Sequence, residues 1–229
     1  MPQTTALPTV SPQRTPRGYV LTFSLSNFGL YLAVLAPAVG GLSVKIQSLV
    51  GLDAAPSQLG LVVGVASLFA LIAQPIAGRL SDRTTSKFGM RRPWIIAGAT
   101  ATTIALVFCG LAPNVGLLLV WLCVAQTTVQ FAFAAQGATL ADQVPEERRG
   151  GVSGIVGAIS PISLVVGAVL LTLLPTDLLR FAVPALIGMV LALIFAFTLK
   201  DRVRVNPPHH AVERQAGPFR VRVQPAHSP

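Results

Sequence analysis

The stretch GRLSDRTTSKFGMRRPW (residues 78–94) places five basic residues and one aspartate between two long apolar segments. This concentration of charge stands out in a chain of 229 residues of which 52% are hydrophobic and only 11% are charged. A soluble globular domain carries roughly 25% charged residues. Since the chain has too few charged side chains to cover a water-facing surface, the stretch is best explained as a short loop between membrane-spanning helices.

Six apolar segments lie along the chain, and each is long enough for a membrane-spanning helix of about 20 residues. We expect these spans at residues 19–41, 58–79, 93–112, 115–140, 152–174 and 178–199. The predicted fold is therefore an all-α membrane domain of six transmembrane helices over residues 19–200. The flanking tails, residues 1–18 and 201–229, are polar and rich in proline and arginine, and we expect both to be disordered and cytoplasmic.

The basic residues are distributed unevenly over the two sides of such a domain. If the N-terminus is cytoplasmic, 15 of the 17 Lys and Arg residues face the inner side, and only Lys45 and Arg180 face the outer side. Cytoplasmic loops carry an excess of Lys and Arg. The split predicts a multi-pass protein of the cell membrane with both termini in the cytoplasm. The net charge of +9 is explained by this topology rather than by binding to nucleic acid.

Topology requires only positive charge, whereas residues 78–94 also contain glycines and an aspartate in a particular order. This order resembles the signature between the second and third helices of the major facilitator superfamily. The five residues between Arg83 and Gly89, where the common form has about one, are similar to the loop of the glycoside–pentoside–hexuronide cation symporters and sucrose-type carriers. A second segment, ADQVPEERRGGVSG (residues 141–154), is similar to the loop after the fourth helix of the same superfamily. The matching positions of the first loop are Gly78, Asp82, Arg83, Gly89, Arg91 and Arg92.

The resemblance implies a secondary active transporter of a small polar solute, for which a sugar and a coupling cation are the candidates. It covers the N-terminal six-helix half of a carrier with about twelve spans, so we expect a truncated carrier that needs a second half or a second copy of itself. In the family the loop at residues 78–94 acts as a conformational latch against a helix of the second half. Two alternatives stay open: the loop is only a solvated topology anchor, or the chain is a non-transporting fragment or accessory subunit.

A faint internal repeat agrees with this family. Gly60 and Gly64 recur 90 positions later as Gly150 and Gly154, and Pro75 has a rough counterpart in Pro161. The shift places the first three spans on the last three, and an odd number of spans gives the two copies opposite orientations. Although glycine and proline are frequent in membrane helices, we predict two inverted three-helix repeats, a known transporter architecture.

Polar side chains inside the predicted spans are the candidates for a solute site. Ser24, Asn27 and Tyr31 share one face of the first span, and Gln126 and Gln130 are one turn apart in the fourth. Because amides and hydroxyls facing lipid would lack partners, we expect these five to line a substrate cavity, with hydrogen bonding between helices as the alternative. Gln74 and Gln136 are instead assigned to packing.

Other chemistry is not indicated by the sequence. Cys109 and Cys123 both lie in apolar segments without metal-ligand spacing, and we interpret them as buried apolar residues. The sequence contains no nucleotide-binding loop and no nucleophile triad, so no enzyme activity, metal or cofactor is predicted. Since no Asp or Glu lies well inside a predicted span, a site for the coupling cation cannot be assigned.

Overall fold

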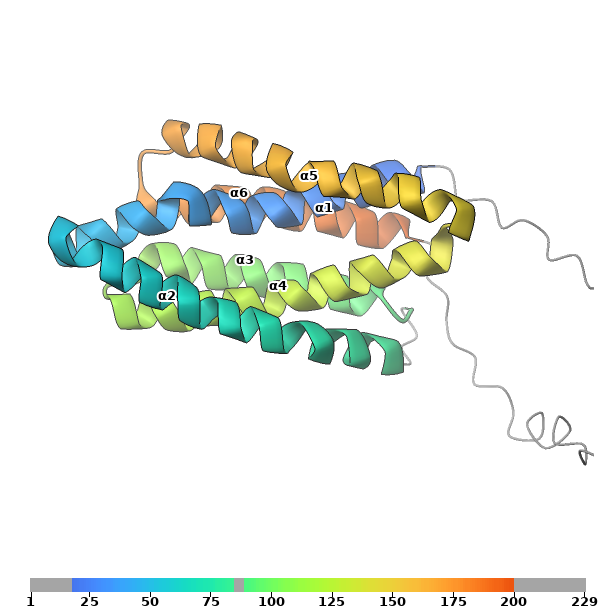
Figure 1. The fold of residues 1–229 in the computed structure, drawn as a ribbon, viewed down its shortest axis with the longest axis horizontal. Coiled ribbons are helices and arrows are strands. Elements are labelled where there is room, and N and C mark those ends of the chain that lie inside the picture. The colour runs from blue at the N-terminus through green and yellow to red at the C-terminus, as the bar shows by residue number, and fades with distance from the viewer. Residues whose placement is uncertain (1–17, 85–88, 200–229) are drawn as a thin grey trace, which may run out of the picture.

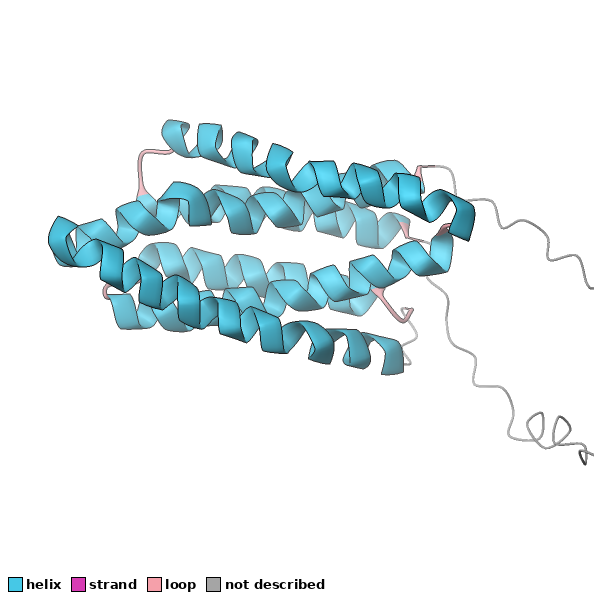
Figure 2. Cartoon of the chain, in the orientation of Figure 1, coloured by secondary structure: helices cyan, strands magenta, loops and turns pink. Residues whose placement is uncertain are grey.

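The computed structural model describes residues 18–84 and 89–199, without the side chains of Asp82 and Arg83. These ranges are almost entirely helical, as Figures 1 and 2 show, and the expected all-helical class is confirmed. Residues 1–17 of the predicted N-terminal tail, all of the predicted tail at residues 201–229, and Lys87 in the charged loop lie outside the described residues. The elements are α1 (Tyr19–Ala36), the π-helical turn η1 (Pro37–Gly41), α2 (Leu42–Arg83), α3 (Arg92–Leu111), α4 (Val115–Gln143), α5 (Glu146–Leu173) and α6 (Asp177–Thr198).

The connection between α1 and α2 is helical. By length and composition the described helices form five stretches that could cross a membrane, and the first, Tyr19–Ser81, has 63 residues and contains both α1 and α2. Residues 42–57, which lie between the first two predicted spans, belong to α2. Helical structure continues through η1, where the Leu42 N–H bonds to the Pro37 carbonyl in a wider turn. Pro37, which has no N–H to donate, lies at the first position of this turn. The backbone then bends at Gly51, where φ is 80° and only glycine is unstrained.

The other helices start at residues with suitable capping chemistry. The side chain of Asn114 accepts a hydrogen bond of 2.9 Å from the Leu117 N–H at the start of α4. Thr176 accepts in the same way at the start of α6, and two acidic residues occupy the first turn of α5. Such side chains satisfy free N–H groups and offset the helix dipole. Asn114 thus ends the short loop before α4, and Thr176 ends the short loop before α6.

The helices form two groups of three, which Figure 1 shows as an upper and a lower group. In the upper group α1 packs against α5 and α6, in the lower group α4 packs against α2 and α3, and α3 against α6 joins the two. Small residues permit the closest contacts: a Cβ at Gly188 would lie 2.5 Å from the Gly29 carbonyl oxygen, and one at Gly98 would lie 2.8 Å from the Ala132 nitrogen. Close packing of small residues is a main source of helix association in membranes. Substituting either glycine would therefore separate a helix pair that positions the polar side chains described below.

Candidate functional site

A hollow of about 410 Å³ lies between α1, α2, α4 and α5. It extends from the middle of these helices toward the ends where α4 finishes and α5 begins. Its lining combines polar groups with aromatic rings, and none of its residues is charged. The lining residues are Phe23, Asn27, Tyr31, Gln74, Gln130, Phe133, Gly137, Leu140, Ser153 and Val156.

The hollow brings together three of the five predicted cavity residues. Asn27 and Tyr31 of α1 and Gln130 of α4 all line it. Ser24 does not, and its enclosed Oγ has no hydrogen-bond partner among the described residues. Gln126 lines a different hollow, although it lies only one turn from Gln130.

Two further polar residues of the hollow come from outside the predicted set. Gln74 of α2, assigned to packing by the sequence, lines the hollow, while Gln136 is buried and packs as assigned. Ser153 of α5 was not among the residues that the sequence analysis named. The signal for Gln74 was present in the sequence: it is a lone amide within a long apolar segment, where contact with lipid is costly.

The polar groups of the hollow differ from most other hydroxyls and amides of the bundle in their hydrogen bonding. Elsewhere, hydroxyls bond to the backbone one turn earlier: Thr102 donates to the Gly98 carbonyl at 2.7 Å, and Ser163 to the Ile159 carbonyl at 2.9 Å. By contrast, four polar side chains of the hollow make no hydrogen bond with any residue in 18–84 or 89–199. All four side chains are half-buried or exposed in the bundle, so water or a solute can reach them as a hydrogen-bond partner. They are Tyr31, Gln74, Gln130 and Ser153.

Aromatic rings form the apolar part of the wall. The rings of Tyr31 and Phe133 lie 4.9 Å apart between centroids at an interplanar angle of 44°, and Phe23 lines the same hollow. Aromatic rings offer large apolar contact area, and tyrosine adds a polar group at its edge. The arrangement suits an uncharged solute that has both hydroxyl groups and an apolar face.

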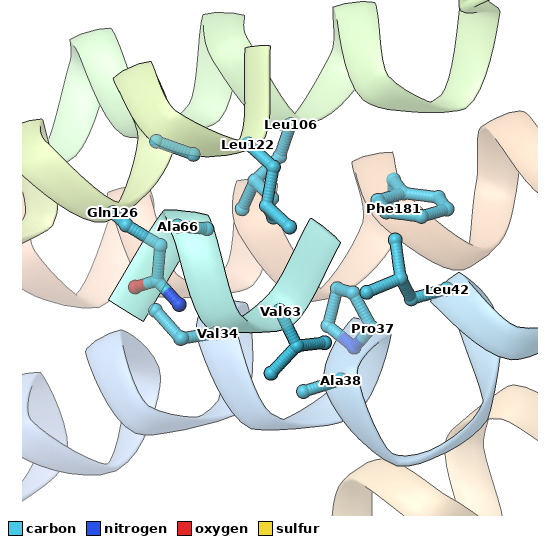
Figure 3. Close-up of a pocket in the computed structure, with 11 residues that line it drawn as sticks. Val34, Pro37, Ala38, Leu42, Val63, Ala66, Leu106, Leu122, Gln126 and Phe181 are labelled. Carbon is cyan, nitrogen blue, oxygen red and sulfur yellow. The ribbon is translucent and has the colours of Figure 1, made fainter. Parts of the chain in front are cut away.

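A second, smaller hollow of about 50 Å³ lies beside η1 and is shown in Figure 3. Gln126 is the one polar side chain in its lining, and in Figure 3 its amide lies next to Val34 and Ala66. The amide makes no hydrogen bond with the described part of the chain. The two predicted glutamines of α4 therefore lie in surroundings of opposite polarity. The other lining residues are Val34, Pro37, Ala38, Leu42, Val63, Ala66, Leu106, Leu122, Ala125 and Phe181.

The charged stretch that follows α2 ties several helix ends together. The Arg91 Nε lies 3.4 Å from Asp142 Oδ2 of α4, and its Nη1 donates to Ser81 Oγ of α2 at 3.0 Å. Arg92 donates to the Leu199 carbonyl at the end of α6. Arginine suits this position because its guanidinium can donate several hydrogen bonds at once. Two residues named by the family signature thus connect α2, α3, α4 and α6 within this one bundle.

The remaining signature residues are placed as follows. Gly89 has a φ of 102°, which a residue with a side chain rarely adopts, so it sets the direction of the chain just before Arg91. A Cβ at Gly78 would meet no described atom within 4 Å, so no neighbouring helix of this bundle requires a glycine there. The side chains of Asp82 and Arg83 lie outside the described residues.

A second charged cluster holds the opposite ends of the helices. Lys45 of α2 lies 3.6 Å from Asp177 of α6 and donates to the Gly110 carbonyl of α3 at 3.1 Å. Arg180 lies 3.4 Å from the same carboxylate. Lys45 and Arg180 are the two basic residues that the sequence assigned to the outer side. Both are paired with one aspartate, and the pair with Lys45 fixes the start of α2 to the bundle.

Comparison with known proteins gives a family match over most of the chain. The model of the Major Facilitator Superfamily matches residues 18–227. The sucrose transport protein SUC4 of Arabidopsis thaliana is 49% identical over 49 residues, which make up 21% of this chain and 10% of that protein. The sucrose transport protein SUT1 of Oryza sativa subsp. japonica is 34% identical over 92 residues, 39% of this chain and 15% of the relative.

A third relative has a different named substrate. The general alpha-glucoside permease of Schizosaccharomyces pombe is 40% identical over 52 residues, 23% of this chain and 9% of that protein. The matched part of the chain thus spans between 9% and 15% of the length of these three relatives.

Proposed function

Because the chain belongs to the Major Facilitator Superfamily, we propose that it forms the solute-binding bundle of a secondary active sugar transporter. The hollow between α1, α2, α4 and α5 carries the proposal. Its unpaired hydroxyl and amide groups and its aromatic wall suit a neutral, hydroxyl-rich solute, and its lining has no charged residue. The relatives named for sucrose and α-glucoside transport support the same class of solute.

The proposed architecture is six spans arranged as two inverted repeats. Exchanging α1 with α4, α2 with α5, and α3 with α6 converts each strongly packed helix pair into another packed pair. The burial pattern of α2 also returns in α5 after 90 residues. Such internal symmetry supports a repeat, because equivalent helices should bury equivalent faces. The pairs buried at both positions are Val62 and Val152, Ala73 and Ser163, Ala77 and Gly167, and Ser81 and Leu171.

In this proposal the domain of residues 19–200 spans the cell membrane, and both tails are cytoplasmic, because 15 of 17 basic residues then face the cytoplasm. The loop from Gly78 to Arg92 keeps its proposed role as a conformational latch on that side. A second bundle, from a second half or a second copy, completes the solute path, since alternating access moves one bundle against another. A coupling cation belongs to the proposal through the family, without an assigned site.

The proposal is tested by equilibrium binding of radiolabelled sucrose and maltose to the purified chain in lipid nanodiscs. We expect saturable binding that Gln130→Leu weakens about tenfold, the typical effect of one lost hydrogen bond to a solute. Thr127→Val is the matched control on the same helix, because the Thr127 hydroxyl already donates to the Cys123 carbonyl at 2.8 Å. Absence of saturable binding, or equal loss in both variants, would contradict the proposal and favour an accessory subunit.

A further inference from the structure

Asn27 differs from the other polar residues of the hollow, because its amide is held in one orientation. Its Nδ2 donates to the carbonyl oxygen of Phe23 at 3.0 Å, one turn earlier in α1. Gln136 of α4 donates to the same carbonyl from across the interface at 3.1 Å. The amide of Asn27, only 6% exposed, is thus fixed by a carbonyl that a second helix also engages.

These contacts decide which atom of Asn27 faces the hollow. A backbone carbonyl can only accept hydrogen bonds, so the atom next to it must be Nδ2 and not Oδ1. Oδ1 accepts no hydrogen bond from residues 18–84 or 89–199 and, unlike Gln136 Oε1, is not an enclosed atom without a partner. Since Asn27 lines the hollow, Oδ1 is the atom that it presents there.

We infer that Asn27 Oδ1 accepts a hydrogen bond from a hydroxyl group of the solute. The hollow then requires a donor at this position and rejects an analogue that cannot donate. The inference rests on the proposed function, because it takes the hollow as the solute site. Gln74 and Gln130 differ from Asn27, since their amides make no bond with the described residues and can rotate to donate or accept. Specificity at Asn27 is therefore stricter than at either glutamine, and a buried acceptor left unpaired is costly.

The orientation of the amide is tested without any solute. The sequence contains three asparagines, Asn27, Asn114 and Asn206, so selective labelling with ¹⁵N-asparagine gives three side-chain amide signals, assigned by single substitutions. Asn114 is the internal control, because its Oδ1 is bonded to the Leu117 N–H and its amino group is not. We expect one Asn27 Nδ2 proton to exchange with solvent at least about tenfold more slowly than both Asn114 Nδ2 protons. Equal exchange at the two residues would overturn the inference.

The second measurement compares sucrose with analogues in which fluorine replaces one hydroxyl at a time, because carbon-bound fluorine cannot donate. We expect one analogue to bind about tenfold more weakly than sucrose, and this difference to disappear in Asn27→Leu but persist in Gln130→Leu. A difference that persists in Asn27→Leu, or the absence of any such analogue, would overturn the assignment. A slowly exchanging Asn27 in a chain that binds no sugar would support the orientation and refute the proposed function.

Discussion

Gln126 and Gln130 lie one turn apart on α4, yet they face hollows of opposite character. Gln130 shares its hollow with four other polar side chains, whereas Gln126 is the one polar side chain in the lining of the other. Four residues advance a helix by about 6 Å, which is enough to change the neighbouring helices. Residues of α1 and α2 line both hollows, but α5 contributes only to that of Gln130, whereas η1, α3 and α6 contribute only to that of Gln126. Two amides on one helical face therefore need not share a site.

The two ends of the bundle should differ most in their access from the cytoplasm. In the proposed topology Ser153 lies near the cytoplasmic end of α5, whereas Asp53, beyond the bend at Gly51, lies at the outer end. With Cys109 and Cys123 replaced by alanine, a membrane-impermeant thiol reagent should label Asp53→Cys in intact cells and Ser153→Cys in inside-out vesicles. This all-or-none difference is the largest effect that we expect. Labelling of Ser153→Cys in intact cells would contradict the proposed topology and indicate the reverse orientation.

Removing the polar character of the larger hollow should have the next largest effect. The double variant Gln74→Leu with Gln130→Leu should bind sucrose about a hundredfold more weakly, because each lost hydrogen bond contributes about tenfold and the two residues lie on different helices. Gln126→Leu is the control and should change sucrose affinity less than about twofold, within the usual effect of a distant substitution. The dissociation constants from equilibrium binding decide the comparison. If Gln126→Leu weakens binding as much as a single change in the larger hollow, the two hollows form one site.

Tyr31 contributes both a hydroxyl group and an aromatic ring to the wall of the larger hollow, and substitutions can test the two contributions separately. Tyr31→Phe removes the hydroxyl and keeps the ring beside Phe133, whose centroid is 4.9 Å away. We expect sucrose affinity to fall about fivefold, within the range for one neutral hydrogen bond and less than for Gln130→Leu, because the ring contact is kept, with unchanged thermal stability. Phe133→Leu should instead weaken binding and also lower stability, because it removes an aromatic contact. Equal stability losses in the two variants would show that the Tyr31 hydroxyl has a structural role.

The sequence predicted the family, the all-helical class and most helix positions, because apolar length and loop charge are local properties. The match to the superfamily over residues 18–227 confirms the family that the charged loop indicated. The sequence left residues 42–57 between two predicted spans without a predicted structure, and the helix that continues there packs Leu42 and Ile46 into the core.

The site was predictable only in part, for a related reason. Periodicity along one helix places Asn27 and Tyr31 on a common face, but it does not reveal which residues of other helices lie opposite. Gln74 and Ser153 come from α2 and α5, and only the three-dimensional arrangement brings them to the same hollow as Gln130. For the same reason the sequence could not separate Gln126 from Gln130.

The smallest expected effect is on the free energy of unfolding. Replacing Gln126 should raise it, whereas replacing Gln130 should not. The amide of Gln126 has no hydrogen bond with residues 18–84 or 89–199, and the other side chains around it are apolar. Its hollow of about 50 Å³ has room for a few water molecules, but each would need two to four polar partners, which this lining does not supply. Replacing an unpaired amide with an apolar side chain of similar size removes a cost of about 1 kcal/mol or more.

We therefore expect Gln126→Leu to raise the free energy of unfolding by about 1 kcal/mol, measured by denaturation with SDS in mixed micelles. Gln130→Leu should leave this free energy unchanged or lower it slightly, because the Gln130 amide faces a larger, polar hollow that water can fill. Thr127→Val, which removes a backbone-bonded hydroxyl between them, calibrates the loss expected from an ordinary polar contact of α4. If Gln126→Leu destabilises the bundle as Thr127→Val does, then the Gln126 amide has a partner in the membrane, and the contrast between the two hollows is wrong.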